Sequence, residues 1–518
     1  MAENKLVKTG VYGLDEVLLG GIPQGNVILV QGQTGTGKTL LGIEFIYRGI
    51  VDFDEPGIIV VFETSPLKLM RDAENFGWNL DELVQSNRLR IIFTSPQVLD
   101  QELRSPDSLL LETADEINAQ RIFIDGISLM ASVTPYNGHS TGSYRDLLQQ
   151  LIAGLQRENL TAMLSHEVIA HPEQNVMLPV AEFLSDTLIV LQRKAYEQGI
   201  RRTLEITKSR GQDFDVGEHS LRISAGKGLE VFRRVQARPR HDTAQPTSTT
   251  RRSVIGVDPL DSLIGGGIFE GSTTMVIGVA GVGKTVLGTQ LLLEGAVKQQ
   301  KRGLLVSLDE HPAQIIRNAK TLGLDLEQHV DSGMIQVLHE SPQELEIDAH
   351  FDRITRTIER YNIDRLLIDG MTSYSNALQN QRLYRDFFHA LVAYSKQRLM
   401  TAFFNYENPE LFGITHYMPE FGVSSIVDNI ILLNLVELSN TLHRAITVVK
   451  ARGSNHRFAT QEYTIGQGGI TLLPVDESKA LPVLPFQSYY GLLSRAPART
   501  SPDLLTPNAL RTGKPDQG

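Results

Sequence analysis

Short apolar runs alternate along this chain with segments that place hydrophobic residues at helical spacing. The runs NVILV, GIIVVF, RIFID and DTLIVL predict buried strands, and the segments LLGIEFIYRGI and YRDLLQQLIAGLQ between them predict helices. Strands that are apolar throughout are buried on both faces, as in a parallel sheet with helices on each side. The pattern therefore predicts an α/β fold built on a mostly parallel, twisted sheet.

The whole pattern occurs twice in the chain. TGVYGLDEVLLGGIPQGNVILVQGQTGTGKTLLGIEF aligns with IGVDPLDSLIGGGIFEGSTTMVIGVAGVGKTVLGTQL, so Lys38 matches Lys284 at an offset of 284 − 38 = 246. Near the end of the copies, Lys208 matches Lys450 at an offset of 450 − 208 = 242. A drift of four residues indicates a duplicated domain with small loop insertions.

The duplication predicts the domain boundaries. We expect domains at residues 1–236 and 254–475, and an exposed linker at residues 237–253, which are rich in Pro, Thr and Arg. Residues 476–518 have prolines and polar clusters, which predict a mobile tail.

Composition then restricts the classes of function. The chain of 518 residues has no cysteine, which excludes disulfides, thiolate metal sites and cysteine nucleophiles. Its formal charge of −11 argues against a protein that mainly coats nucleic acid. The segment MAENKLVKTG lacks the apolar core of a signal peptide, and no window has the roughly 18 apolar residues of a membrane helix. We therefore expect a soluble cytoplasmic protein, with no membrane partner.

Two glycine-rich segments, GQTGTGKT at residues 32–39 and GVAGVGKT at residues 278–285, each follow a predicted strand and open a helix. In such a loop the backbone amides surround phosphates, the lysine reaches the β and γ oxygens, and the last hydroxyl ligates Mg²⁺. We therefore predict ATP and Mg²⁺ as cofactors. The predicted nucleotide contacts are Gly35, Thr36, Gly37, Lys38 and Thr39 in the first copy and Gly281, Val282, Gly283, Lys284 and Thr285 in the second.

Acidic residues at strand ends are the other parts of such a site. Asp125 and Asp369 end apolar strands where ATPases with these loops hold the magnesium, although a capping role is the structural alternative. Candidate carboxylates for the attacking group are Glu63 in VVFETSP and the pair Asp309 and Glu310 in LVSLDEHP. We predict Thr39, Asp125, Thr285, Asp309 and Asp369 as the residues around the metal.

Basic residues recur near the end of each copy, namely Arg202, Lys208 and Arg210, and then Arg444, Lys450 and Arg452. Because each copy already has a lysine in its phosphate-binding loop, these positions suit the phosphates of a neighbouring subunit, as an arginine finger does. This interpretation predicts a ring.

One pair of histidines does not predict a metal site. His166 and His171 in HEVIAH are five residues apart, whereas a zinc-protease helix needs four, and they follow a predicted strand.

Together these features resemble the KaiC family of RecA/DnaB-like ATPases, from about residue 7 to residue 475. The resemblance rests on both GKT loops, VVFETSP with NFGW, SLDEHPAQIIRNA, the strands ending at Asp125 and Asp369, RRTLEITKSRG and HRAITVVKARGSNH. It implies tandem RecA-like domains in a hexameric double ring with ATP between subunits. It also implies ATP hydrolysis in the N-terminal ring and serine/threonine self-phosphorylation in the C-terminal ring. By the same resemblance, His456 is a nucleotide contact.

The family's phosphorylated pair lies just before an I-x-D-x-I-I-L strand, which matches Ser424 and Ser425. Aligning Asp428 on Asp186 places Glu182-Phe183 opposite this pair. A turn that required two hydroxyls would show them in both copies, so this asymmetry also favours phosphoacceptors. The family's kinase carboxylates fall on Asp309 and Glu310.

The resemblance implies a homohexamer and a KaiB-like partner. The tail does not resemble the segment that recruits KaiA, so we do not expect a KaiA-like partner. Two other functions share these loops, namely a RecA- or DnaB-like ATPase driven by nucleic acid, and a nucleotide-gated scaffold without kinase activity. The acidic balance argues against nucleic acid as a partner.

Overall fold

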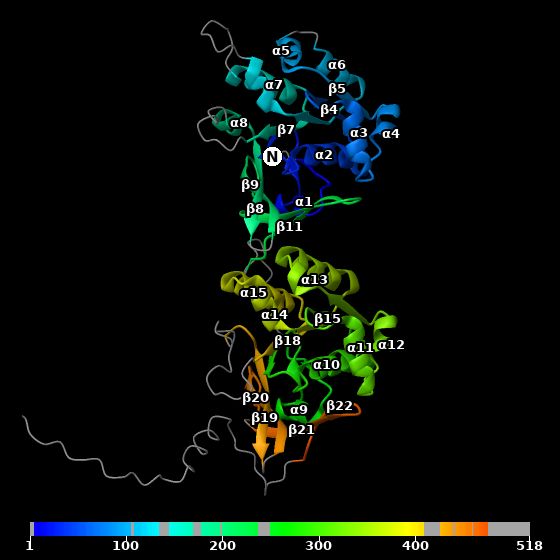
Figure 1. Cartoon of the computed structure of the whole chain (residues 1–518), viewed down its shortest axis with the longest axis vertical. Coiled ribbons are helices and arrows are strands. Elements are labelled where there is room, and N and C mark those ends of the chain that lie inside the picture. The colour runs from blue at the N-terminus through cyan, green and yellow to red at the C-terminus, as the bar shows by residue number, and fades with distance from the viewer. Residues whose placement is uncertain are drawn as a thin grey trace, which may run out of the picture. The chain divides into compact units, whose positions relative to one another are not determined.

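The computed structural model describes residues 5–104, 108–133, 144–168, 178–196, 199–236, 249–408, 425–438, 441–457 and 459–474 (Figure 1). The chain divides into two compact units, the first built on residues 1–244 and the second on residues 245–342, 363–376 and 394–518. Residues 343–362 and 377–393 group with the first unit. The predicted tail and most of the predicted linker lie outside the described residues.

The first unit contains a nine-stranded sheet with the strand order β11-β10-β9-β8-β3-β7-β6-β4-β5. The strands from β8 to β5 are parallel, and β9, β10 and β11 continue the sheet as antiparallel neighbours. Their bounds are β3 (Val27–Gly32), β4 (Gly57–Val61), β5 (Leu89–Phe93), β6 (Arg121–Asp125), β7 (Thr161–Glu167), β8 (Thr187–Tyr196), β9 (Gly199–Ser209), β10 (Glu218–Ser224) and β11 (Gly228–Phe232).

The second unit repeats this sheet with the order β22-β21-β20-β19-β14-β18-β17-β15-β16. Its strands are β14 (Thr273–Gly278), β15 (Gly303–Ser307), β16 (Ile335–His339), β17 (Arg365–Asp369), β18 (Thr401–Glu407), β19 (Asn429–Leu438), β20 (Thr441–Ala451), β21 (Thr460–Gly466) and β22 (Gly469–Leu472). The predicted duplication and the mostly parallel α/β fold are therefore confirmed.

Helices and short strands surround the first sheet. They are β1 (Leu6–Val7), β2 (Ile22–Pro23), α1 (Leu14–Val17), α2 (Lys38–Phe53), α3 (Pro66–Glu74), α4 (Leu80–Gln85), α5 (Pro96–Arg104), α6 (Leu109–Glu116), the 3₁₀ helix η1 (Ile127–Val133), α7 (Tyr144–Arg157) and α8 (Leu178–Leu184).

The later part of the chain adds a corresponding set. It consists of β12 (Arg252–Ser253), β13 (Ile268–Phe269), α9 (Asp258–Leu263), α10 (Lys284–Lys298), α11 (Pro312–Thr321), α12 (Leu326–Asp331), the 3₁₀ helix η3 (Pro342–Glu344), α13 (Ile347–Tyr361), α14 (Met371–Leu378) and α15 (Gln381–Gln397).

The continuous apolar strands are explained by hydrophobic cores on both faces of the sheet. In β3, Ile28 and Val30 join a core formed with α2, α3 and α4, whereas Val27 and Leu29 join another core formed with α6 and α7. Successive side chains of a strand point to opposite faces, so both faces of β3 must be apolar. Figure 1 shows helices on both sides of this sheet.

The pairing of strands shows the same offset between the two copies as the sequence does, residue by residue. The β8–β9 ladder shifts between Leu188 and Ile189, and the β19–β20 ladder shifts between Ile430 and Ile431, again 242 residues later. Asp186 accepts a hydrogen bond from the amide of Val27 at 3.0 Å, as Asp428 does from Thr273 at 3.0 Å. The alignment of Asp428 on Asp186 is therefore confirmed.

Candidate functional site

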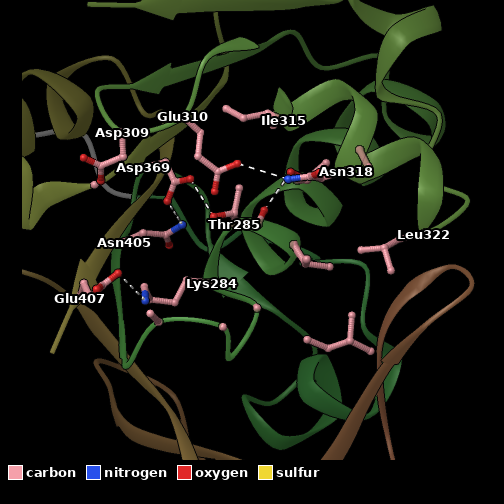
Figure 2. A pocket seen from close by; sticks show the side chains of 18 of the residues that line it. Lys284, Thr285, Asp309, Glu310, Ile315, Asn318, Leu322, Asp369, Asn405 and Glu407 are labelled. Carbon is pink, nitrogen blue, oxygen red and sulfur yellow. Dashed lines mark hydrogen bonds and ion pairs between the residues drawn. The ribbon is translucent and has the colours of Figure 1, made fainter. Parts of the chain in front are cut away.

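The second phosphate-binding loop joins β14 to α10. Gly283 has φ 96°, a conformation that favours glycine, and directly precedes Lys284 at the start of the helix. Nζ of Lys284 donates to the carbonyls of Gly278 and Val279, at 2.9 Å each. Burial lowers the pKa of Lys284, while the carboxylate of Glu407, 3.6 Å away, acts in the opposite direction (Figure 2). The lysine therefore lies over the loop, where phosphate oxygens would replace its carbonyl partners.

Thr285 and Asp369 lie together beside this lysine. Oγ1 of Thr285 donates to Oδ2 of Asp369 at 2.7 Å, and Nδ2 of Asn405 donates to Oδ1 of the same carboxylate at 2.8 Å (Figure 2). Burial raises the pKa of Asp369, and both hydrogen bonds oppose that effect. A hydroxyl and one carboxylate are hard oxygen ligands, which fit Mg²⁺ when the rest of its shell is phosphate and water.

The acidic pair after β15 lies at the same cavity, whose volume is about 360 Å³. The Glu310 side chain reaches toward Asn318, whose Nδ2 is 3.4 Å from its carboxylate, whereas Asp309 turns to the other side of Asp369 (Figure 2). Burial raises the pKa of Glu310, and the charges of Asp369 and Asp309 act in the same direction. Both acids therefore lie close to the loop, where a carboxylate could accept a proton.

The cavity also has an apolar end, lined by Ile315, Leu322, Leu324 and Ile465. An apolar wall next to a phosphate-binding loop suits the flat ring of a nucleotide base. The sequence interpretation did not identify these residues, nor Asn405, Glu407 and Asn318, because they come from three other segments. The only local signal was the polar end of the strand TAFFNYE.

The first copy has the same arrangement around its loop. Nζ of Lys38 donates to the carbonyls of Gly32 and Gln33 at 2.9 and 3.0 Å, and Oγ1 of Thr39 donates to Asp125 at 2.8 Å. Burial lowers the pKa of Lys38. The loop, Asp125, Glu63 and Thr64 line one cavity, so the loop and the acids predicted for this site lie together.

Two positions next to the loops differ between the copies. Asp125 receives a hydrogen bond from Ser165, where the second copy uses Asn405. Glu167 accepts a hydrogen bond from Thr34 of the loop, whereas its counterpart Glu407 pairs with Lys284. The two sites therefore have the same plan and different polar surroundings.

In the first copy, the structure places Lys208 and Arg210 together and Arg202 apart from them. In β9, Arg202 and Lys208 are six residues apart, which is about 20 Å along a strand. Lys208 donates to the carbonyl of Glu182 at 2.8 Å, and Arg210 donates to that of Phe183 at 2.9 Å. Arg202 lies at the end of the strand nearer the loop, so these residues cannot form one finger on one phosphate.

The second copy repeats the separation. Lys450 donates to the carbonyl of Val427 at 2.7 Å, and Arg452 donates to that of Ser425 at 3.1 Å. Arg444 of β20 pairs with Leu435 of β19, two residues past Leu433, which is the partner of the last residue of β14. Arg444 therefore lies at the end of the sheet where the phosphate-binding loop begins. His456 follows β20, and its Nδ1 is 3.4 Å from the carbonyl of Ser454.

Ser425 and the phosphate-binding loop lie at opposite ends of β14. Asp428, three residues after Ser425, is bonded to Thr273 at the first residue of that strand, and the loop begins after Gly278. Six residues of parallel strand span about 17 Å. Ser424 lies outside the described residues.

Other expectations concern metals and membranes. His166 lies in β7, so the predicted strand is confirmed there, and His171 lies outside the described residues. Within the described ranges, no group of three or more His, Asp or Glu residues could hold a metal ion. In that same part of the chain, no helix has the length and hydropathy needed to cross a membrane.

Comparison with known proteins identifies the family of this chain. The KaiC ATPase family matches residues 7–236 and 254–477. The chain is 33% identical over 503 residues to the circadian clock oscillator protein KaiC of a Picosynechococcus species, a match that covers 96% of this chain and 93% of that protein. It is 32% identical over 503 residues to circadian clock oscillator protein KaiC 1 of a Synechocystis species, covering 96% and 92%. These matches support a KaiC-like ATPase and autokinase function, and the chain belongs to the KaiC ATPase family.

Proposed function

We propose that this protein binds Mg-ATP at both loops, hydrolyses it, and transfers the γ-phosphate from the second site to Ser424 and Ser425 of another subunit. The proposal is supported first by the position of Ser425. Because this residue lies just before β19, beside the amino end of β14, and the loop follows the carboxyl end of β14, about 17 Å of strand separates it from its own nucleotide site. A phosphoryl group moves directly between two oxygens in contact, so the acceptor must come from a neighbour.

The basic residues at that end of the sheet support the same arrangement. Lys450 and Arg452 are held beside the segment that contains Ser425 by hydrogen bonds to its backbone carbonyls. A neighbour's nucleotide that meets this segment would therefore meet two cations as well. This supports the homohexameric ring expected from the family, with each nucleotide between two subunits.

The chemistry would proceed as follows at the second site. Lys284 and the loop amides hold the β and γ phosphates, and Thr285 with Asp369 would hold Mg²⁺, which supplies charge neutralisation when bound. The serine oxygen forms a bond to the γ phosphorus as the bond to the β–γ bridging oxygen breaks, and ADP leaves. Asp309 or Glu310 accepts the serine proton. Lys450 and Arg452 of the acceptor subunit would stabilise the negative charge on the phosphates.

At the first site, water would replace the serine. Glu63 is the acid that follows β4, and Thr64 occupies the position of the second acid. A single carboxylate can orient water for attack, so we infer ATP hydrolysis without protein phosphorylation in this copy. We also infer a cytoplasmic location, and the surface of the assembled ring as the binding site for a KaiB-like protein.

The test is phosphosite mapping by mass spectrometry after incubation with Mg-ATP. We expect phosphate on Ser424 and Ser425 in the natural chain and none in Lys284→Ala. A mixture of Lys284→Ala chains with chains carrying Ser424→Ala and Ser425→Ala should restore phosphate on the former, because donor and acceptor are then on different subunits. Absence of phosphate on the natural chain would contradict the proposal. ATP-dependent hexamers without phosphate would instead indicate a nucleotide-gated scaffold.

A further inference from the structure

Arg193 of β8 lies over the first phosphate-binding loop of its own chain. β8 pairs with β3 in parallel, with Leu191 opposite Gly32, so the residue two positions later lies beside the loop. NH1 of Arg193 is 3.5 Å from the point where a Cβ on Gly35 would lie. Because a Cα–Cβ bond is about 1.5 Å long, the guanidinium group lies within about 5 Å of the Cα of Gly35, in the loop that would surround the phosphates.

A second arginine lies directly opposite the first. Arg193 pairs in register with Arg202 of β9, which places their Cβ atoms about 5 Å apart. Among the described residues, no carboxylate forms an ion pair with either guanidinium, and the buried Nε of Arg202 has no hydrogen-bond partner. Like charges in a cross-strand pair are unfavourable, and an anion between them would reverse that effect.

The second copy lacks this feature. Its residue opposite Arg444 is Leu435, whose side chain packs on the core of that unit. A Cβ on Gly281, the counterpart of Gly35, would meet no atom within 4 Å. The added charge is therefore specific to the first loop, and the other copy shows that leucine fits the equivalent position of the second sheet.

We propose that Arg193 binds the terminal phosphates of the nucleotide in the first copy, from the same chain and together with Arg202. This inference rests on the proposed binding of ATP by the first loop. A guanidinium group can donate two parallel hydrogen bonds to phosphate oxygens, which a lysine cannot do. Because Arg193 would contact ground state and transition state alike, its main effect falls on affinity.

The experiment uses the full chain with Lys284→Ala, so that ATP binding reports on the first loop. ATP affinity is measured by equilibrium dialysis for Arg193→Leu, which introduces the residue of the second copy, and for Arg193→Lys. Arg157→Leu is the matched control, because Arg157 is an exposed arginine at the end of α7 in the same unit. We expect about a tenfold weaker affinity for Arg193→Leu, a smaller loss for Arg193→Lys and no change for Arg157→Leu.

Salt dependence separates a phosphate contact from a structural effect. ATP affinity should fall more steeply with added KCl in the parent chain than in Arg193→Leu, because the variant has lost one charge contact. Unchanged affinity in Arg193→Leu, or an equal loss in Arg157→Leu, would overturn the inference. If the parent with Lys284→Ala binds no ATP, the proposed function of the first loop fails instead. Phosphate on Ser424 and Ser425 is measured separately and does not depend on this outcome.

Discussion

The side-chain hydroxyl of Ser373 in α14 donates a hydrogen bond to Oδ1 of Asp309, two residues after β15. Gly370 lies on the other side of this carboxylate, with φ 92°, and a Cβ there would be 2.3 Å from Oδ2 of Asp309. Because glycine has no side chain, position 370 leaves the space that the carboxylate of Asp309 occupies. Ser373 and Gly370 together fix the direction of one of the two acids beside the second loop.

Replacing Ser373 by alanine should slow phosphoryl transfer about 3- to 10-fold and leave ATP affinity nearly unchanged. The reason is that a charge-assisted hydrogen bond is lost at an acid of the site and not at the loop. The rate is measured by phosphate incorporation into Ser424 and Ser425 in single-turnover experiments.

Two variants control this test. Ser373→Thr keeps the hydroxyl and should recover most of the rate. Ser375→Ala removes another half-buried hydroxyl of α14 and should have no effect. An equal loss of rate in Ser375→Ala would attribute the effect to the helix and not to Asp309.

Removing the Asp369 carboxylate should change the magnesium requirement of the second site. Asp369 is bonded to Thr285 and Asn405, so Asp369→Asn keeps the shape of the site and removes one negative charge. We expect the Mg²⁺ concentration for half-maximal phosphate incorporation to rise about tenfold, from the loss of a favourable interaction of about 1.4 kcal/mol. Binding of ATP without Mg²⁺ should not weaken. A magnesium dependence identical to that of the natural chain would exclude Asp369 from the metal site.

The first unit should lose stability as pH rises toward neutrality because of Glu44. This residue of α2 is 1% exposed and accepts a hydrogen bond from the amide of Leu229 at 2.8 Å. Burial raises the pKa of Glu44 to about 7 from 4.5. Between these values the folded state binds the proton more tightly than the unfolded state, so the free energy of unfolding falls as pH rises. The expected loss between pH 4.5 and 8 is roughly 2–3 kcal/mol.

The second copy provides the variant that tests this. Its counterpart is Gln290, which accepts from the amide of Ile470 at 2.9 Å and donates to the carbonyl of Gly468 at 3.2 Å. Glu44→Gln should therefore raise protection from hydrogen exchange in β11 at pH 8 and change it little at pH 5. Gln290→Glu should lower protection in β22 at pH 8. If hydrogen exchange in β11 had the same pH dependence in the natural chain and in Glu44→Gln, Glu44 would not be the group responsible for the loss of stability.

A buried arginine in the second unit lacks the acid that its counterpart has. Arg121 forms an ion pair with Glu55 at 2.5 Å, whereas Arg365, 1% exposed, donates to the amide oxygen of Gln299 at 2.8 Å. Burial lowers the pKa of Arg365 to about 10.

Gln299→Glu should therefore stabilise the second unit by about 1–2 kcal/mol, because a partner is added to a charge that is already buried. Glu55→Gln should destabilise the first unit by a similar amount. Thermal unfolding of both variants measures this, and a lower melting temperature for Gln299→Glu would contradict the prediction.

Much of the candidate site could be predicted from local sequence. A phosphate-binding loop is contiguous, and its neighbours are a strand and a helix that can be recognised by their patterns. Two of these acids, Asp125 and Asp369, end strands, and the other three, Glu63, Asp309 and Glu310, follow strands. The carboxyl ends of parallel strands meet at one edge of the sheet. These acids therefore lie beside the loops, as expected. The duplication further allowed the comparison that singles out Ser424 and Ser425.

The duplication, the α/β class and the two loops with their acids can be predicted from the sequence, because each depends on periodicity or on neighbours along the chain. The end of the sheet that each basic residue occupies follows from the pairing of strands in three dimensions. Arg202 and Lys208 lie in one strand and are close in sequence, yet a strand extends about 3.4 Å per residue and separates them. Arg193 reaches Gly35 only because β8 pairs with β3 in a particular register, and that register depends on contacts between distant segments.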